Sequence, residues 1–402
     1  MKILLVSSTY EPFVVGGAER VAQALATSLG RAGHRVVVVT TQPQGEARDR
    51  EVDGVAVHYV PVRNLYRPFS QHHPAVVTKA LWRLVDSYNL AMLPVLTRIL
   101  QHEAPDIVNT HNMLGFSVAA WSAAQRLNLP IVHTMHDQYL LCHRSTMFKA
   151  GRNCSVQCQS CRMMALPRKH ASRHVDVAVG VSQFIVDRHA RFGYFPSAQP
   201  MVIYNTGLIN ASPAVFSRVP SSRMRFGFLG QIIPTKGLHS LIDAFVAEEL
   251  MDAELWIAGR GEGSYEQDLR RRTQAVHNIH WLGHVRPTEL FENIDVLVVP
   301  SVWHDTAPLV LLEAASHSIP VLGSNRGGIP ELIATLGGWM FEPDDPASLR
   351  AALIRCKRTP AQVLEAGRAA MQYAKQLKAS DWCQRYLEAF TLAIERRQAR
   401  VA

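Results

Sequence analysis

The sequence of 402 residues lacks any long uninterrupted apolar run. No stretch approaches the roughly 18 apolar residues that a membrane-spanning helix requires. The apolar start, residues 3–6, is too short for a secretory signal peptide, so we interpret it as a first strand and expect a cytoplasmic protein. Internal repeats and low-complexity tracts are also missing. Because 48% of the residues are hydrophobic, the composition argues against disorder and for a sizeable buried core.

The sequence has no acidic surplus, and its formal net charge of +9 is unevenly distributed. Residues 1–218 contain 22 Lys and Arg against 12 Asp and Glu, a net charge of +10, whereas residues 219–402 contain 20 against 21. A basic surface attracts nucleic acid, anionic lipid or a phosphorylated acceptor, and a merely solvated surface is the plain alternative. No nucleic-acid-binding motif accompanies the charge, so we expect no nucleic-acid partner.

Short β-branched runs alternate with amphipathic segments along the chain. The runs are apolar throughout, which is typical of parallel strands covered on both faces. The amphipathic segments include residues 18–30, 238–248 and 309–317. The alternation predicts doubly wound parallel α/β sheets. The expected strands are residues 3–7, 36–40, 106–110, 131–134, 175–179, 224–229, 255–258, 279–282, 296–299 and 320–323.

This pattern runs twice, which predicts two domains. The first set of strands ends near residue 204, and the Ser-, Pro- and Ala-rich residues 210–222 are typical of a linker. The segment from Pro360 is predicted to be one continuous helix. We expect a first domain at residues 1–210, with an insertion at residues 138–170, and a second domain at residues 223–380. A terminal helix at residues 381–402 is expected to pack back on the first domain.

In open α/β sheets, ligands bind at the carboxyl ends of strands beside helix N-termini. The first such junction is Gly16-Gly17, where small residues and free amides suit a diphosphate, or form a plain turn. The second runs from Gly230 to Lys236-Gly237, and a lysine at this place can bind phosphate as a point charge. Weaker glycine patterns end two more strands, at Gly259-Arg260-Gly261 and Gly283-His284-Val285.

The most informative junction is residues 300–314, where a buried strand, a polar loop and a helix follow one another. The amides of Leu309 and Val310 would open that helix. Asp305 precedes the helix and Glu313 lies inside it. Ionised carboxylates only accept hydrogen bonds, so these two suit the hydroxyls of a sugar and a ribose.

These elements, together with Gly327-Gly328-Ile329-Pro330-Glu331, resemble in order those of the retaining glycosyltransferases called family four. The resemblance covers nearly the whole chain. It implies the GT-B fold, two Rossmann-like domains facing a central cleft. It also implies a UDP- or GDP-sugar donor, a lipid-linked or polysaccharide-precursor acceptor, and retention of anomeric configuration.

The resemblance also implies roles for individual positions. Gly16 and Gly17 approach the donor diphosphate, Lys236 binds it, and Asp305 holds the transferred sugar where the family usually has a glutamate. The catalytic set would be His136, Lys236 and Asp305. On the acceptor side we place His111, Asn112 and Asp137. The remaining donor-binding positions are Gln231, Gly259, Arg260, Val285, Pro308, Leu309, Val310 and Glu313.

Two positions depart from the family pattern. Gln231 replaces an arginine, which removes one cation from the phosphate site unless another, such as Arg326, contributes. Pro308 replaces a glycine and has no N–H to donate. Fixed positive groups can stabilise a leaving diphosphate without a metal, and no Asp-x-Asp pattern is present. We therefore expect no cofactor for the chemistry. A nucleotide-sugar epimerase of the same fold, or an inactive binding protein, is the alternative.

Four cysteines cluster at Cys142, Cys154, Cys158 and Cys161, a pattern that suits structural Zn²⁺, an iron–sulfur cluster or reduced thiols. Basic residues surround them and recur near Tyr66, Phe69 and Trp82. Basic and aromatic residues together favour an anionic membrane surface, so we expect peripheral membrane association. The basic residues are Arg63, Arg67, Lys79, Arg83, Arg144, Lys149, Arg152, Arg162, Arg168, Lys169 and Arg173.

Overall fold

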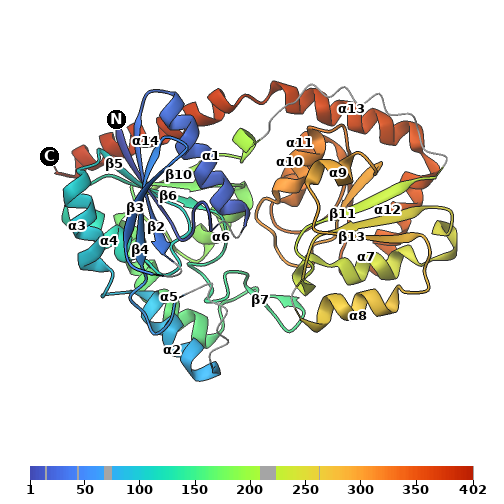
Figure 1. Cartoon of the computed structure of the whole chain (residues 1–402), viewed down its shortest axis with the longest axis horizontal. Helices are drawn as coiled ribbons and strands as arrows, with labels where there is room; N and C mark the ends of the chain where they lie inside the picture. Colours follow the sequence, from blue (N-terminus) through green and yellow to red (C-terminus); the bar gives the residue numbers. More distant parts are fainter. Residues whose placement is uncertain (14–15, 43–44, 68–74, 209–222, 262, 402) are drawn as a thin grey trace. The chain divides into compact units, whose positions relative to one another are not determined.

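A computed structural model describes residues 1–13, 16–42, 45–67, 75–208, 223–261 and 263–401 (Figure 1). The chain divides into two compact units, each discontinuous in sequence. The first comprises Met1–Met147, Cys154–Leu208 and Ala379–Ala402. The second comprises Phe148–Asn153 and the described part of Ile209–Lys378. The predicted linker, residues 210–222, and Phe69 lie outside the described residues.

The first unit is built on an eight-stranded sheet in the order β10-β9-β6-β5-β1-β2-β4-β3. All neighbours pair in parallel except β3, which is antiparallel to β4. The apolar runs at its centre are buried on both faces, as parallel strands require. The strands are β1 (Lys2–Ser7), β2 (Arg35–Gln42), β3 (Arg48–Val52), β4 (Val55–Pro61), β5 (Ile107–Thr110), β6 (Ile131–Met135), β9 (Val177–Gly180) and β10 (Gln199–Val202).

Helices flank this sheet on both faces (Figure 1). The last of them, α14, packs on the first unit: the Trp382 ring fills the space beside Gly207, and Arg397 forms a 2.7 Å ion pair with buried Asp176. The helices are α1 (Gly17–Arg31), α2 (Val76–Ser87), α3 (Leu93–Glu103), α4 (Ala119–Arg126), α5 (Gln159–Ala171), α6 (Gln183–Arg191), α14 (Ala379–Val401) and the 3₁₀ turns η1 (Ser172–His174) and η2 (Thr206–Leu208).

The second unit has a six-stranded, fully parallel sheet in the order β13-β12-β11-β14-β15-β16. A small hairpin of β7 (Phe148–Lys149) and β8 (Arg152–Asn153) also belongs to this unit. The sheet strands are β11 (Arg225–Leu229), β12 (Glu254–Ala258), β13 (Ile279–Gly283), β14 (Val296–Val299), β15 (Val321–Ser324) and β16 (Gly338–Phe341).

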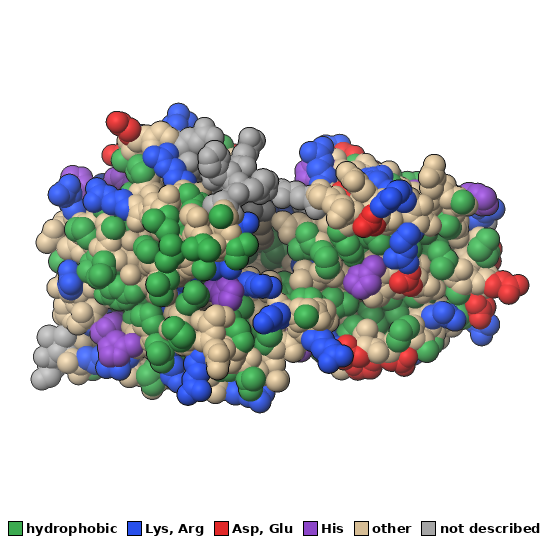
Figure 2. Space-filling view, turned by 90° about the horizontal axis from the view of Figure 1, so that it is seen from below, with side chains coloured by type: hydrophobic (Ala, Val, Ile, Leu, Met, Phe, Trp, Pro, Cys, Tyr) green, Lys and Arg blue, Asp and Glu red, His purple; other side chains and the backbone are tan. Residues whose placement is uncertain are grey.

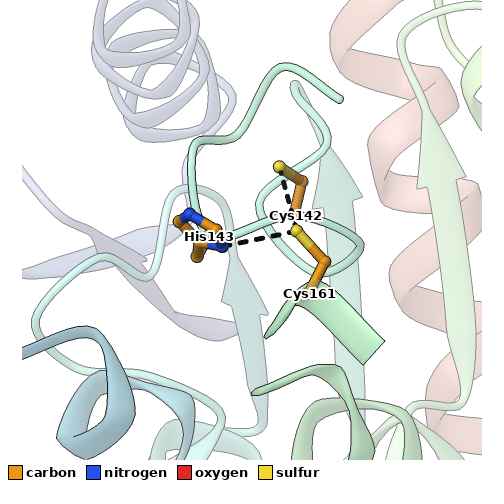
Figure 3. Close-up of side chains that lie close together, drawn as sticks. All are labelled: Cys142, His143 and Cys161. Carbon is orange, nitrogen blue, oxygen red and sulfur yellow. Dashed lines mark hydrogen bonds between the residues drawn. The ribbon is translucent and has the colours of Figure 1, made fainter. Parts of the chain in front are cut away.

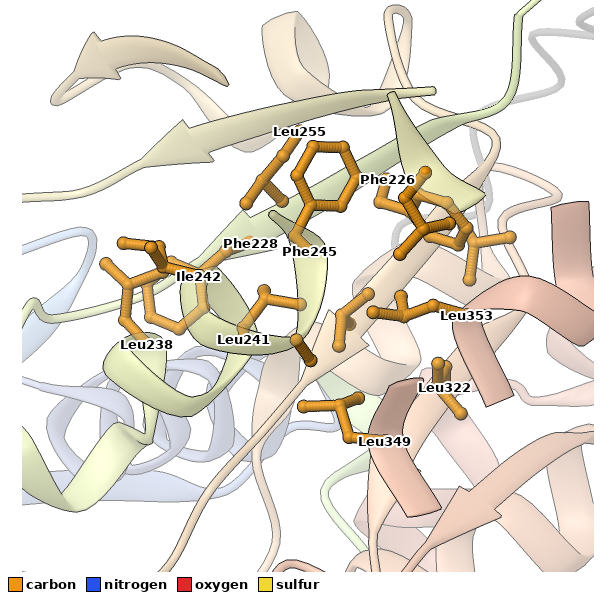
Figure 4. Packing of buried hydrophobic residues seen from close by; sticks show 14 of the residues in the cluster. Phe226, Phe228, Leu238, Leu241, Ile242, Phe245, Leu255, Leu322, Leu349 and Leu353 are labelled. Carbon is orange, nitrogen blue, oxygen red and sulfur yellow. The ribbon is translucent and has the colours of Figure 1, made fainter. Parts of the chain in front are cut away.

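Helices cover both faces of the second sheet, and its core is aliphatic and aromatic. Phe226 and Leu255 from the sheet pack against Phe245 of α7 and Leu353 of α12 (Figure 4). The helices are α7 (Leu238–Phe245), α8 (Ser264–Arg272), α9 (Pro287–Phe291), α10 (Leu309–Ala315), α11 (Ile329–Leu336), α12 (Pro346–Arg358), α13 (Pro360–Gln376) and the 3₁₀ turns η3 (Pro234–Lys236) and η4 (Glu248–Leu250).

The predicted α/β fold with two parallel sheets is confirmed. The continuous helix predicted from Pro360 onward is wrong, because α13 ends at Gln376 and α14 begins at Ala379. Leu377 has an extended backbone, with φ −80° and ψ 111°. Helix α13 belongs to the second unit and α14 to the first. Because the two segments pack on different cores, the helix that the local sequence favours is interrupted between them. Among the described residues, no helix is long and apolar enough to cross a bilayer.

Candidate active site

In the second unit, the structure brings Lys236 and Asp305 together. Lys236 ends η3, just after β11, and Asp305 lies in the loop after β14, which is the neighbouring strand. Lys236 Nζ lies 2.5 Å from Asp305 Oδ2, and the ammonium stands 5.7 Å from the centre of the Trp303 ring. An ammonium carries three donor hydrogens, so the pair leaves donors for an incoming anion.

The two loops pack closely because Gly237 follows the lysine. Gly237 has φ +72°, and a Cβ at this position would overlap the carbonyl oxygen of Pro300. The amide of Val302 donates a 3.0 Å hydrogen bond to the carbonyl of Thr235. Glycine is therefore required both for its left-handed backbone and for the close approach of the two loops.

Asp305 is held from a third strand as well. The amide of Gly328 donates to the Asp305 carbonyl oxygen at 2.8 Å. Gly327 has φ +61°, and any side chain there would overlap the backbone of Asp305. With Asp305 only 5% exposed, these contacts fix the carboxylate firmly beside the lysine. The sequence motif that contains Gly327 predicted no role for this glycine.

Two hydrogen bonds join the same loop to the β7–β8 hairpin. Asn153 Nδ2 donates to the carbonyl oxygen of Val302 at 2.8 Å, and the amide of His304 donates to Asn153 Oδ1 at 2.9 Å. Asn153 thus satisfies one backbone acceptor and one backbone donor of the loop that carries Asp305. Asn153 was not predicted from the sequence, since a lone asparagine about 150 positions from the loop gives no signal.

The other donor-side residues lie at the carboxyl ends of neighbouring strands. Gly230 and Gly259 follow β11 and β12, and their loops are joined by a 2.9 Å hydrogen bond from the Ile232 amide to the Arg260 carbonyl. The side chains of Gln231 and Arg260 are exposed, and Val285 is half-buried after β13.

Helix α10 begins at Leu309 without a capping side chain. Pro308 is the N-cap residue, and its carbonyl accepts a 3.2 Å bond from the Leu311 amide. Its missing N–H therefore costs α10 no hydrogen bond, because an N-cap position needs only the carbonyl. Leu309, Val310 and Glu313 are half-buried. Arg326, considered above as a substitute cation, forms a 2.5 Å ion pair with Asp344.

In the first unit, the candidate histidines form a buried chain. His111 Nε2 lies 2.7 Å from Asn109 Oδ1, and His111 Nδ1 lies 2.8 Å from His136 Nε2. Because Asn109 Nδ2 faces two acceptors, Asn109 Oδ1 accepts from His111 Nε2–H. His111 Nδ1 is then an acceptor, and His136 donates to it through Nε2–H. This assignment makes Nδ1 of His136 the unprotonated nitrogen.

Both imidazoles are neutral near pH 7. Burial lowers the pKa of His136 to about 3. Burial, and then the neighbouring His136 and His133, hold the pKa of His111 well below its usual value. A neutral imidazole in this position offers hydrogen bonds rather than a charge.

The glycine junction of the first unit is organised by Glu19, whose side chain is buried. Its carboxylate accepts from the Gly16 amide at 2.9 Å and from Asn112 Nδ2 at 3.0 Å. Gly17 opens α1. Burial raises the pKa of Asp137 to about 6, and the charge of Glu19 adds to the shift. This role of Glu19 was not predicted from the sequence.

The four clustered cysteines divide into two groups. Cys142 and Cys161 are buried, with their sulfurs 3.5 Å apart, and His143 Nδ1 lies 3.3 Å from the sulfur of Cys161. Cys154 and Cys158 are half-buried and lie outside this three-residue group. His143 was not among the ligands predicted from the sequence, because the cysteine spacing alone suggested four thiolates.

With this geometry in place, comparison with known proteins gives the family. Residues 16–206 match a family described as "Glycosyl transferase 4-like domain", and residues 223–358 match "Glycosyl transferases group 1". An uncharacterised 42.6 kDa protein in the cps region of Klebsiella pneumoniae is 31% identical over 344 residues, which cover 86% of this chain and 90% of that protein. The chain belongs to the group 1 glycosyltransferases.

Solved structures that are similar to this group 1 glycosyltransferase show its fold. Sucrose-phosphate synthase from Thermosynechococcus elongatus matches with a TM-score of 0.75 at 17% identity, covering 100% of both chains. HepE from Anabaena, in complex with UDP, matches with a TM-score of 0.70 at 18% identity, covering 97% of this chain and 100% of that one. The fold is therefore GT-B.

Proposed function

We propose that this group 1 glycosyltransferase transfers a hexose from a UDP- or GDP-sugar, with retention of configuration and without a catalytic metal. The acceptor in this proposal is a lipid-linked or polysaccharide-precursor glycan. The observation that carries the proposal is the Lys236–Asp305 pair at the carboxyl ends of β11 and β14. The relative from a cps region and the UDP complex of HepE support it.

In this proposal Lys236 compensates charge on the diphosphate as the sugar–phosphate bond breaks. Stabilising a leaving group with a fixed cation that needs no rearrangement is an efficient form of catalysis. Asp305 binds hydroxyls of the transferred sugar, Glu313 binds the ribose, and the amides of Leu309 and Val310 bind phosphate or sugar oxygens. Gln231, Gly259, Arg260 and Val285 contribute the rest of the donor surface.

The first unit would supply the acceptor side through His111, Asn112 and Asp137, with His136 beside the reacting sugar. A neutral His136 can donate or accept a hydrogen bond without adding a positive charge that would oppose an oxocarbenium-like centre. Gly16 and Gly17, whose junction is fixed by Glu19, would receive diphosphate oxygens through their amides.

The donor proposal is tested by thermal shift with a panel of nucleoside diphosphates and their sugars, without added Mg²⁺ or Mn²⁺. We expect saturable stabilisation by one nucleotide, lost in Lys236→Ala and Glu313→Ala. Lys357→Ala is the matched control, because Lys357 has the same 25% side-chain exposure and pairs with Asp252. Stabilisation by no nucleotide would contradict the proposal.

Turnover then separates transfer from its alternative. We expect the identified donor to be consumed only when an acceptor glycan is present. NMR of the product should show the same anomeric configuration at the transferred sugar as in the donor. Conversion of the donor sugar into an epimer without acceptor would instead show an epimerase.

We further propose that the first unit docks on an anionic bilayer through α2 and α5. These helices pack against each other and expose an apolar surface, with Val76 83% exposed, Leu84 54% and Leu166 62%. Figure 2 shows green apolar side chains gathered on one face of this unit, with blue Lys and Arg around them. The other exposed apolar residues of these helices are Val77, Leu81, Val85 and Met163. An exposed apolar surface of this kind marks an interaction site.

The charge of the two helices selects the bilayer as the occupant. Asp86, the one acidic residue in α2 and α5, is 1% exposed, whereas Lys79, Arg83, Arg162 and Lys169 are half-buried or exposed. Apolar side chains flanked by cations fit acyl chains below anionic headgroups. A lipid-linked acceptor would be presented at such a surface.

Vesicle flotation tests this surface. We expect binding to vesicles that contain phosphatidylglycerol, and at least about tenfold weaker partitioning for Leu81→Glu/Leu84→Glu, since two leucines lose their burial in lipid. Val246→Glu/Met251→Glu is the control, because both residues are exposed apolar residues of the second unit. Equal partitioning of the two double variants would refute membrane docking through α2.

A further inference from the structure

We propose a structural Zn²⁺ site in the segment that follows His136 and Asp137, with Cys142, His143 and Cys161 as three ligands and Cys158 as the fourth. This set differs from the four-cysteine group that the sequence pattern suggested, because His143 replaces Cys154.

The spacing of the three ligand atoms matches zinc. The two sulfurs are 3.5 Å apart, the Cys161 sulfur is 3.3 Å from His143 Nδ1, and all three atoms lie within 4.8 Å of one another. Tetrahedral zinc, with Zn–S of about 2.3 Å and Zn–N of about 2.0 Å, separates its ligand atoms by roughly 3.5–3.8 Å. Figure 3 shows the three side chains converging from two segments.

The fourth ligand follows from the local backbone. Cys158 is the N-cap of α5 and precedes Cys161, in the first turn of that helix, by three positions. A Cys-x₂-Cys pair of this kind has the spacing of structural zinc sites. The amide of Arg144 lies 3.4 Å from the Cys142 sulfur and would stabilise its thiolate, as second-layer donors do in metal sites.

The donor chemistry excludes a hard cation. Residues 138–171 contain no Asp or Glu, so the segment offers sulfur and nitrogen ligands but no carboxylate oxygen. Thiolate and imidazole ligands select zinc over Mg²⁺ or Ca²⁺. A four-iron cluster requires its thiolates on different irons, which would hold Cys142 and Cys161 farther apart than 3.5 Å.

The backbone between the ligands supplies an independent reason for a metal. Ser145, Met147 and Ala150 all have positive φ, between +46° and +60°. Left-handed backbone is unfavourable for a non-glycine residue, so this loop needs compensating interactions. Zinc would supply them by joining the start of the loop to α5, while the thiol protons of three cysteines pass to solvent.

Elemental analysis of the full-length protein, purified without chelator, tests the site. We expect about one zinc per chain, lost in Cys142→Ser and Cys161→Ser and retained in Cys383→Ser, which changes a buried cysteine of α14. Cobalt substituted for zinc should give a thiolate-to-metal charge-transfer band. Absence of metal, iron in place of zinc, or a Cys142–Cys161 disulfide in the non-reduced peptide map would overturn the proposal.

The ligand assignment has its own test. We expect His143→Ala to weaken zinc retention under competition by a chromogenic chelator, His143→Cys to restore it, and Cys154→Ser to behave as wild type. Loss of zinc from Cys154→Ser with retention in His143→Ala would instead establish the four-cysteine site. If the ligand variants fail to fold, stripping and retitrating the wild-type protein with zinc gives the same stoichiometry.

Discussion

In the first unit the candidate residues are buried, neutral imidazoles, whereas in the second they are a half-buried ammonium and its carboxylate partner. His111 and His136 hold each other in one hydrogen-bonded chain and expose little surface. Lys236 keeps a quarter of its side chain exposed beside Asp305. Two units with the same kind of sheet therefore prepare for different tasks: one presents fixed dipoles, and the other presents charge that an anion can reach.

The units also differ in where they bury titratable groups. In the first unit, burial lowers the pKa of His136 to about 3 and of His189 to about 4, and lowers those of His111 and His133 well below the usual value. In the second unit, burial lowers the pKa of His239. The buried histidines of the first unit therefore make its stability sensitive to acid.

The largest expected difference is in acid stability. A histidine in the unfolded chain binds a proton near pH 6.5, whereas these buried histidines in the folded unit do not. The free energy of unfolding of the first unit is therefore largest above pH 6.5 and falls as the pH falls toward 4. For His136 and His189 together the loss is of the order of several kcal/mol. Hydrogen exchange measures this as amide protection factors at pH 7.5 and pH 4.5. We expect both strands to be protected at pH 7.5, and β6 but not β14 to lose its protection at pH 4.5.

A control sharpens that experiment. His189→Gln removes a buried proton-binding group and should flatten the pH dependence of β6 protection, whereas exposed His170→Gln should not. Simultaneous loss of protection in β6 and β14 would mean that the units do not differ in this respect.

A second prediction concerns buried charge. Asp86 accepts from Tyr139 Oη at 2.6 Å and lies 3.6 Å from Arg168 of α5, and both charged side chains are almost fully buried. Asp86→Ala leaves the arginine unpaired, so we expect a loss of about 3–5 kcal/mol in the free energy of unfolding of the first unit. Denaturant unfolding followed in each unit measures it.

The matched change in the second unit is Asp243→Ala, whose partner Arg272 is half exposed. Exposed pairs contribute about 0–1 kcal/mol, so this variant should unfold like the wild type. Equal destabilisation by the two variants would show that the buried Asp86–Arg168 pair contributes no more to stability than the exposed Asp243–Arg272 pair.

A third prediction separates binding from turnover at Asp305. Asp305→Asn keeps the side-chain shape but removes the negative charge beside Lys236, so nucleoside diphosphate should bind at least as tightly as before. Turnover should fall about 10- to 100-fold, because a charge-assisted hydrogen bond to the sugar is weakened. Calorimetry and initial rates give the two readouts, with Asp295→Asn as control, since Asp295 is paired with Arg225 in the same unit. Weaker diphosphate binding without a change in kcat would contradict this role.

The smallest expected effect is at Gly327. A methyl group there would displace Asp305, so we expect Gly327→Ala to cost about 1–3 kcal/mol of stability and to impair turnover. Gly337→Ala is the control, because Gly337 has a similar φ of +79° with open space around its Cα. Thermal unfolding and kcat/KM of both variants separate the effect of backbone strain from that of displacing Asp305. Equal loss of turnover in both variants would show that backbone strain, and not the displacement of Asp305, impairs turnover.

Local patterns predicted most strands of the two sheets, because those strands are largely apolar. Residues 36–40 and 296–299 are short, continuous apolar runs of the kind that buried strands have in an α/β fold. Three sheet strands, β3, β4 and β16, were missed. Arg48–Val52 is polar and exposed at a sheet edge, Val55–Pro61 alternates buried and exposed residues, and Gly338–Phe341 is only partly buried. The break between α13 and α14 was missed because no Gly or Pro marks it.

The candidate site was predictable where a residue type at a strand end already implies chemistry, as with Lys236, Asp305 and His136. Its supporting residues were not, because they act through contacts between distant segments. Asn153, Glu19 and Asn109 are ordinary polar residues until folding places them beside a loop, an amide or a histidine. His143 was overlooked because its neighbour Cys142 belonged to a more conspicuous pattern.

The position of α14 sets an order of events during synthesis. Asp176, fully buried beside β6, is paired with Arg397 and Arg400, which leave the ribosome more than two hundred residues later. Domains usually fold as they emerge, the N-terminal one first. Here the unit whose synthesis starts first can be completed only last, and until then it holds an uncompensated carboxylate. The nascent chain therefore holds an incomplete first unit until α14 emerges, and we expect truncated chains that lack α14 to be cleaved by proteases more readily.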